Sequence, residues 1–288
     1  MNWVISSALM FASSVVLYLA IRKGTLLKIP TQLNNLAMFI LPVLAYAFIA
    51  YVSKAEMKIT PFQFILILVT AIFFSYLGNV LSLISLEYAP NPGYSLAISK
   101  SYVVFTSIVS VFVFQSELTV KSAVAIALIV ISSALISINK GDNTIRRENI
   151  MWLPLSLGAF FCWGMLALMS KYLLDIGVGV LPRLIYSMVI VSALIILEMN
   201  FKKVKYAGLR IDQLMTLLII GISASGFNYF MQLGYQLAPN PGYINAVNAS
   251  SISLVTLFSI FLFKDEFSFR RFVGIIGATL GLLFLFLK

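Results

Sequence analysis

Lys100 lies in the apolar stretch ISKSYVVFTSIVSVFVF, which could lie inside a membrane. It follows Pro92 by eight residues, about 12 Å along a helix that begins at that proline. A lysine near the centre of a bilayer costs roughly 2.5–3.5 kcal/mol to insert, so an intramembrane cation is by default a functional residue. We therefore expect Lys100 to face a cavity and to attract a carboxylate or phosphate on a substrate. The alternative is a salt bridge to a fixed carboxylate, either Glu87 or Glu198.

Polar side chains recur at spacings of three and four residues in otherwise apolar segments, as in Ser75, Asn79 and Ser82. Such stripes are expected to face a wet cavity, although amides also join membrane helices at around 0.6 kcal/mol each. Because stripes occur in both halves of the chain, we favour a cavity. The predicted substrate-binding residues are Lys100, Asn79, Asn228, Asn245, Asn248, Gln232, Trp163, Tyr94 and Tyr243.

The composition is that of a polytopic membrane protein, with 61% hydrophobic and 10% charged residues. The net charge of +10 comes from basic residues scattered in short loops, so we expect no nucleic-acid partner. One cysteine, Cys162, and no histidine argue against a disulfide framework and a zinc site. The sequence has no Gly-rich phosphate loop and no paired intramembrane carboxylates, so we expect neither ATP-driven transport nor catalytic residues. We also expect no cofactor and no metal.

Breaks rich in charge, proline, glycine or asparagine divide the chain into ten segments near the 20 residues of a spanning helix. The first segment lacks a basic leader, so we expect it to remain as a helix. The predicted spans are 2–21, 33–52, 62–86, 92–113, 120–138, 151–170, 183–200, 211–235, 241–262 and 270–287.

The hexapeptide APNPGY occurs twice, at 89–94 and 238–243, with an offset of 149 residues. The same offset pairs Trp3 with Trp152 and Asn79 with Asn228. We predict an all-α membrane protein made of two five-helix repeats, residues 1–138 and 151–288, joined by a linker at 139–150. Because five is odd, the repeats are expected to be inverted relative to each other, as in many secondary transporters.

The repeated hexapeptide predicts a capped helix start after a tight turn. Asn91 and Asn240 can accept hydrogen bonds from the free N–H groups of the helix that follows, and proline fits the first helical position. The motif is therefore predicted to be a structural turn. In the functional alternative, Tyr94 and Tyr243 line the two entrances on opposite membrane sides.

Ten helices in two halves, with FQSEL and FKDEF after the fourth and ninth spans, resemble the drug/metabolite transporter superfamily, specifically its EamA-like branch. The resemblance covers the whole chain and implies eight core helices around a cavity, with the fifth and tenth helices peripheral. It also implies carriage of small metabolites, and some phosphate-sugar carriers of this superfamily place lysines in the fourth helix. The bias of basic loop residues predicts termini outside the cell, whereas the family's aromatic amino acid exporter implies cytoplasmic termini.

We therefore expect a secondary transporter that moves an amino acid or a related carboxylate or zwitterion by alternating access. The alternatives are a carrier of phosphorylated, nucleotide-type or quaternary-amine metabolites, and a lipid-linked flippase. The expected partners are a small-molecule substrate and the lipid bilayer, and the expected location is the cell (inner) membrane. We expect a monomer, with a homodimer as the alternative.

Overall fold

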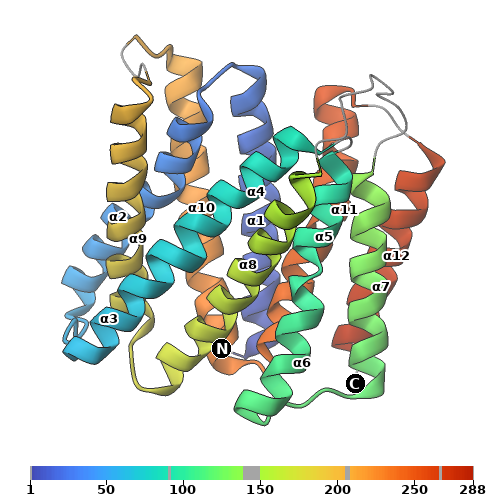
Figure 1. Ribbon diagram of the computed structural model, residues 1–288, viewed down its shortest axis with the longest axis horizontal. Coiled ribbons are helices and arrows are strands. Elements are labelled where there is room, and N and C mark those ends of the chain that lie inside the picture. The colour runs from blue at the N-terminus through green and yellow to red at the C-terminus, as the bar shows by residue number, and fades with distance from the viewer. Residues whose placement is uncertain (1, 90–91, 139–149, 205–207, 266–267, 288) are drawn as a thin grey trace. The chain divides into compact units, whose positions relative to one another are not determined.

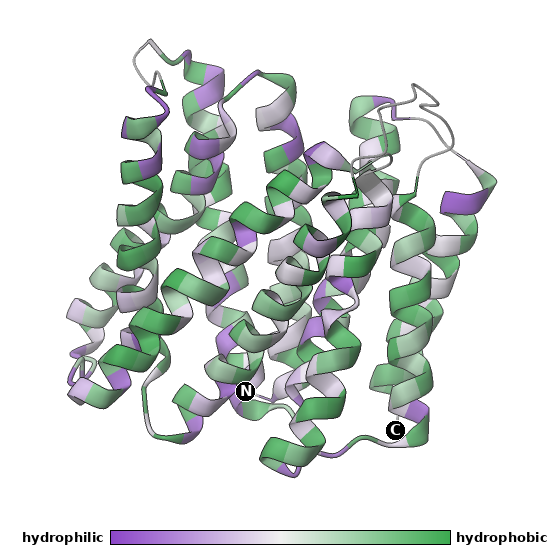
Figure 2. Cartoon of the chain, in the orientation of Figure 1, coloured by the Kyte–Doolittle hydropathy of each residue, from purple (hydrophilic) through white to green (hydrophobic). Residues whose placement is uncertain are grey.

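A computed structural model describes residues 2–89, 92–138, 150–204, 208–265 and 268–287 (Figure 1). These residues form helices and connecting loops, with no strand among them. Within the described ranges, ten helical segments are long and apolar enough to cross a membrane. Figure 2 shows hydrophobic residues along most of each helix. The prediction of an all-α membrane protein with ten spans is confirmed.

The first half of the chain contains α1 (Trp3–Leu26), α2 (Thr31–Ser53), α3 (Pro61–Val69), the π-helix η1 (Thr70–Tyr76), α4 (Leu77–Tyr88), α5 (Pro92–Lys100), α6 (Tyr102–Phe114) and α7 (Val120–Ser137). The second half contains α8 (Trp152–Asp175), α9 (Val180–Phe201), α10 (Ile211–Leu237), α11 (Pro241–Phe263) and α12 (Phe269–Phe286).

The third and fourth spans differ from the uninterrupted helices that the sequence predicts. The π-helix η1 lies within the third span, and the fourth span breaks at Ser101 between α5 and α6. At the break, the Ser101 amide donates to the Ile98 carbonyl at 3.1 Å and the Val104 amide donates to the Ser101 carbonyl at 2.9 Å. Both bonds join residues three apart, one fewer than in an α-helix. The eighth and ninth spans, α10 and α11, are continuous helices.

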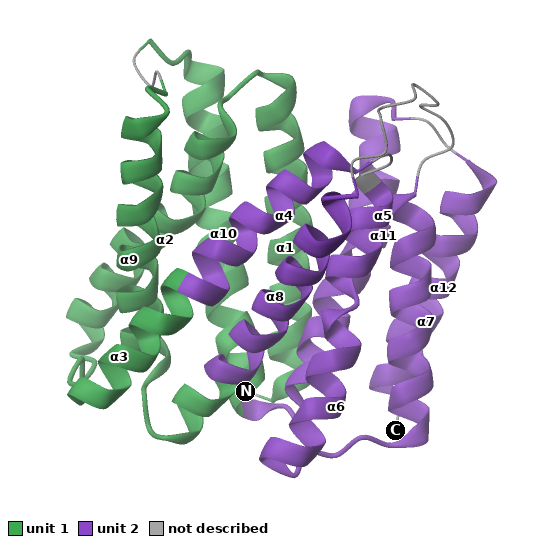
Figure 3. Cartoon of the chain, in the orientation of Figure 1, with its two compact units in different colours: residues 1–72, 171–236 green, residues 73–170, 237–288 purple. Residues whose placement is uncertain are grey.

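The chain folds into two compact units (Figure 3). Unit 1 comprises residues 1–72 and 171–236, and unit 2 comprises residues 73–170 and 237–288. Each unit thus takes segments from both halves of the sequence. The division into repeats at 1–138 and 151–288 stays a prediction, and most of its linker, residues 139–149, lies outside the described residues.

In unit 1, α2 packs along α9 through a buried cluster of Tyr46, Leu184 and Met188. The Tyr46 hydroxyl, which would be costly to bury without a partner, donates to the Ser225 carbonyl of α10 at 2.5 Å. A second cluster, Ile67 with Leu173 and Val178, packs the start of the third span against the end of α8. These contacts join segments of unit 1 that are far apart in the sequence.

In unit 2, α7 and α12 lie side by side (Figure 1). A Cβ atom added at Gly281 would lie 3.0 Å from the Ala125 carbonyl oxygen, and one added at Gly277 would lie 2.3 Å from Ser132 Oγ. The small residues of α12 therefore serve packing within the chain, as is common for membrane helices, which gain little from hydrophobic burial in lipid.

Candidate functional site

Lys100 is the last residue of α5, at the break in the fourth span. Its Nζ atom lies 4.8 Å from the ring centroid of Trp163 on α8. Tyr102, the first residue of α6, meets the same indole edge-on, with ring centroids 5.9 Å apart and an interplanar angle of 83°. The structure therefore brings together two of the predicted residues, Lys100 and Trp163. It adds Tyr102, which the sequence analysis missed.

Glu198, one of the two carboxylates considered as a partner for Lys100, pairs instead with Lys202 at 2.8 Å. The contact of Lys100 with Trp163 is a cation–π interaction, which contributes up to about 2 kcal/mol when it is desolvated. This is close to the roughly 2.5–3.5 kcal/mol that a mid-membrane lysine costs. The aromatic ring therefore offsets part of the cost that the sequence analysis assigns to a cation here.

Gly78 lets α8 approach α4 closely. A Cβ atom at Gly78 would lie 2.9 Å from Cys162 Cβ and 2.9 Å from Trp163 Cδ1, so any larger side chain would push the indole away. Asn79 is the next residue of α4 and is half-buried. The side-chain amide of Asn79 makes no hydrogen bond to the described part of the chain. The predicted residue Asn79 therefore lies next in sequence to the glycine against which Trp163 packs.

Asn245 and Asn248 lie on α11, also in unit 2, and both are buried. The Asn248 Oδ1 atom accepts no hydrogen bond from the described residues, which is unusual for a buried amide. By contrast, Ser250 and Ser251 donate to carbonyls of their own helix, each at 2.7 Å. Asn248 is therefore the better placed of these polar residues to bind a ligand.

The second APNPGY copy is held by hydrogen bonds. Asn240 Oδ1 accepts from the Gly242 amide at 2.8 Å, and its Nδ2 donates to the Ser107 carbonyl at 3.1 Å and to the Glu117 carbonyl at 3.3 Å. The Tyr243 hydroxyl also donates to the Glu117 carbonyl, at 2.8 Å. These bonds confirm that Asn240 caps α11, and they make a structural turn the better interpretation of this copy.

The two tyrosines of the repeated motif differ in their surroundings. Tyr243 is 5% exposed, whereas Tyr94, in the first turn of α5, is 44% exposed. Asn91, the predicted cap of the fourth span, lies outside the described residues. The prediction that both tyrosines line entrances therefore has different support in the two copies, and exposure favours Tyr94.

Asn228 and Gln232 lie on α10 in unit 1. The Asn228 amide donates to the Ala224 carbonyl of its own helix at 2.9 Å. Gln232 is 2% exposed, and its Oε1 atom accepts no hydrogen bond among the described residues. Both residues stay predicted ligands of a substrate, and they belong to a different unit from Lys100.

Arg183 is a buried cation that the sequence analysis placed at the edge of the seventh span. Helix α9 begins at Val180, three residues earlier than predicted, so Arg183 lies within its first turn and is 4% exposed.

Among the described residues, no group of three or more histidine, cysteine or acidic side chains is arranged to hold a metal ion.

The chain was compared with protein families, curated proteins and solved structures. No curated protein matches the chain. A solved structure, described only as the crystal structure of a protein, matches with a TM-score of 0.79 over 98% of this chain and 97% of the other, at 11% identity. At that identity the likeness shows the fold alone. The model of the EamA-like transporter family matches residues 150–287. Residues 150–287 therefore belong to the EamA-like transporter family, and the chain is a multi-pass membrane transporter, as the resemblance predicted.

Proposed function

We propose that the protein moves a small carboxylate-bearing metabolite, an amino acid or a related zwitterion, by alternating access. The observation that carries the proposal is the position of the Lys100 ammonium over the Trp163 ring at the break between α5 and α6. A cation there can pair with a carboxylate, while Trp163 and Tyr102 offer apolar surface to the rest of the metabolite. Carboxylates bind ammonium groups through charge-assisted hydrogen bonds, which are about twice as strong as neutral ones.

The same contact argues against a quaternary amine as the substrate. Quaternary ammonium groups bind to the faces of aromatic rings because the ring quadrupole attracts cations. In this structure Lys100 already covers a face of Trp163. A cargo that carries only a positive charge would be repelled by Lys100, whereas a zwitterion can place its carboxylate on the lysine. A phosphorylated metabolite is the second candidate, because a phosphate would fit the same lysine.

The break in the fourth span supports a binding role for its surroundings. Discontinuous helices line the substrate sites of many secondary transporters, because the interruption turns backbone groups toward the ligand. Here the break follows directly after Lys100, and the neighbouring residues Ser99 and Ser101 carry hydroxyl groups. Asn79, Asn245 and Asn248 of unit 2 are proposed as further polar contacts.

Alternating access requires parts of the protein that move relative to each other. We propose that the two sequence repeats are inverted and that their relative rocking carries the substrate. We further propose that the protein acts as a monomer in the cell membrane.

A ligand-dependent thermal stabilisation screen on the purified protein tests the proposal, using amino acids, sugar phosphates, nucleosides and quaternary amines. A ligand that binds only the folded state raises the melting temperature in proportion to RT ln(1 + [L]/Kd). We expect stabilisation by a carboxylate or phosphate compound. Lys100→Ala should weaken that binding roughly 10- to 100-fold, the effect of losing one hydrogen bond between charged groups.

Lys121→Ala is the matched control, because Lys121 is exposed and donates to the Leu287 carbonyl at 2.7 Å, whereas Lys100 lies over Trp163. It should leave ligand binding unchanged. Trp163→Phe keeps an aromatic ring and should weaken binding less than Lys100→Ala. If Lys100→Ala and Lys100→Glu both lose folded protein equally, without any change in ligand preference, Lys100 is structural and the proposal is wrong.

A further inference from the structure

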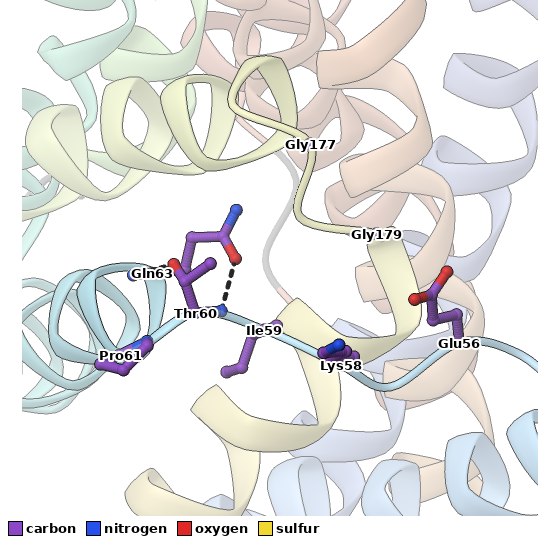
Figure 4. A pocket seen from close by; sticks show the side chains of 8 residues that line it. All are labelled: Glu56, Lys58, Ile59, Thr60, Pro61, Gln63, Gly177 and Gly179. Carbon is purple, nitrogen blue, oxygen red and sulfur yellow. Dashed lines mark hydrogen bonds between the residues drawn. The ribbon is translucent and has the colours of Figure 1, made fainter.

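Unit 1 contains a hollow of about 550 Å³ between the segment that joins α2 to α3 and the segment that joins α8 to α9 (Figure 4). This volume is within the range of small-molecule sites, roughly 300–1,000 Å³. None of the residues predicted to bind the transported substrate lines it. The lining residues are Glu56, Lys58, Ile59, Thr60, Pro61, Gln63, Gly177 and Gly179.

Hydrogen bonds fix the walls of the hollow. Thr60 and Gln63 form a capping box at the start of α3, in which the Thr60 amide donates to Gln63 Oε1 at 2.9 Å. Gln63 Nε2 in turn donates to the Ile176 carbonyl at 3.0 Å, beside the left-handed Gly177 that ends α8. The Tyr186 hydroxyl donates to the Met57 carbonyl at 3.1 Å. The segment from Met57 to Gln63 is therefore tied to α9 and to the loop that precedes it.

Two opposite charges line the hollow. Glu56 and Lys58 are exposed, and neither forms an ion pair or hydrogen bond with the described residues. They lie two residues apart on a non-helical segment, so their Cα atoms are separated by about 7 Å at most. Figure 4 shows Glu56 and Gln63 on the side of this segment that faces the Gly177–Gly179 loop. In the hollow, the Glu56 carboxylate can thus bind a cationic group, and the neighbouring Lys58 ammonium can bind an anionic group.

The hollow lies at the boundary of the membrane, because α2 ends and α3 begins within a few residues of it and both belong to spans. Apolar side chains continue from it along these spans, with Phe62 59%, Ile65 55% and Tyr51 84% exposed. In a membrane protein such surfaces contact lipid, and aromatic residues at this level lie among the headgroups. A ligand with a charged end in the hollow could therefore lay an apolar end along α3.

We propose that this hollow binds the headgroup of a phospholipid that carries both a phosphate and a primary ammonium, as phosphatidylethanolamine does. Lys58 holds the phosphate, Glu56 accepts hydrogen bonds from the ammonium, and the acyl chains lie against Phe62 and Ile65. A quaternary headgroup has no N–H to donate to Glu56, and an anionic headgroup without an ammonium leaves Glu56 unpaired. This inference is independent of the proposed transport substrate.

Native mass spectrometry of the delipidated full-length protein tests the inference, with phosphatidylethanolamine, phosphatidylcholine and phosphatidylglycerol added in equal amounts. We expect phosphatidylethanolamine to be retained about tenfold better than the other two, the effect of one charge-assisted hydrogen bond. Lys58→Gln should lower its retention about tenfold, and Glu56→Gln should remove its advantage over phosphatidylglycerol. Lys54→Gln removes the same charge from a neighbouring residue that does not line the hollow, and it should change neither result.

Equal retention of the three lipids by the wild-type protein would overturn the inference, as would an equal effect of Lys54→Gln and Lys58→Gln. Glycerophosphoethanolamine is the headgroup without acyl chains, and it distinguishes a lipid ligand from a soluble zwitterion with the same charged groups. If it stabilises the protein as well as the lipid does, the ligand is a soluble zwitterion and the assignment to lipid is wrong. Glu56 and Lys58 are exposed, so their variants are expected to fold. Each variant should therefore melt at the same temperature as the wild-type protein when no lipid is present.

Discussion

The capping asparagine of α11 offers a quantitative test of how the repeated hexapeptide works. Asn240 is fully buried and makes three hydrogen bonds through one amide: one accepted from the Gly242 amide and two donated to the carbonyls of Ser107 and Glu117. Asn240→Ala removes all three. Asn240→Asp keeps the acceptor that caps the helix, but it replaces the donating group with an oxygen that faces two carbonyl oxygens.

The expected magnitude follows from these bonds. Loss of the cap costs about 1 kcal/mol. Each donated bond contributes about 0.5–1.5 kcal/mol, and the Glu117 carbonyl keeps a partner in the Tyr243 hydroxyl. We therefore expect Asn240→Ala to destabilise the protein by about 2–4 kcal/mol, which corresponds to a fall in melting temperature of roughly 4–8 °C at about 2 °C per kcal/mol. Asn240→Asp should be at least as destabilising at neutral pH.

The assay is thermal unfolding of the purified protein in one detergent at one scan rate, because membrane proteins often unfold irreversibly. Thr279→Ala is the control, since Thr279 is exposed and bonds only the Ile275 carbonyl of its own helix. It should change stability by less than about 0.5 kcal/mol. If Asn240→Asp melts within about 1 °C of the wild type, the donated bonds contribute nothing and the reasoning fails.

Three further predictions concern packing and access. Gly281→Val should lower the melting temperature in the same assay by roughly 2–6 °C, because its Cβ would meet the Ala125 carbonyl oxygen at 3.0 Å and overpacking costs about 1–3 kcal/mol. Tyr46→Phe should cost about 1 kcal/mol, since it removes the bond to the Ser225 carbonyl and keeps the packed ring. Cys162 is 6% exposed, so a water-soluble maleimide should label it only after denaturation, as mass spectrometry would show.

The spans could be predicted from the sequence because a bilayer requires about 20 apolar residues of each helix, and charged or proline-rich breaks mark the ends. The break at Ser101 could not, because residues 98–101 contain neither glycine nor proline. Its neighbour Lys100 contacts Trp163, which is 63 positions further along the chain. Helical periodicity carries no information about such a contact.

The sequence identified residue types of the candidate site better than the contacts between them. Lys100 and Trp163 were both predicted site residues, but their contact was not predicted. An intramembrane lysine can be recognised in a sequence, but its contact with the aromatic ring of Trp163, far along the chain, cannot. Arg183 escaped notice because the predicted span 183–200 begins at that residue, which placed the buried cation at the end of a helix. Tyr102 lay beside Lys100 in the sequence, and the signal that could have found it is the pairing of aromatic residues with a cation.

The helix break has a consequence for engineering the protein's selectivity. The family model matches residues 150–287, whereas the break, the π-helix and Lys100 all lie before residue 115. On the proposed function, substitutions intended to change the cargo belong in residues 92–114, where the backbone already departs from a regular helix. Libraries in α11 would instead disturb a helix whose first eleven residues are all buried. Residues 92–114 are thus a better place to alter the cargo than α11, where Asn245 and Asn248 lie among buried neighbours.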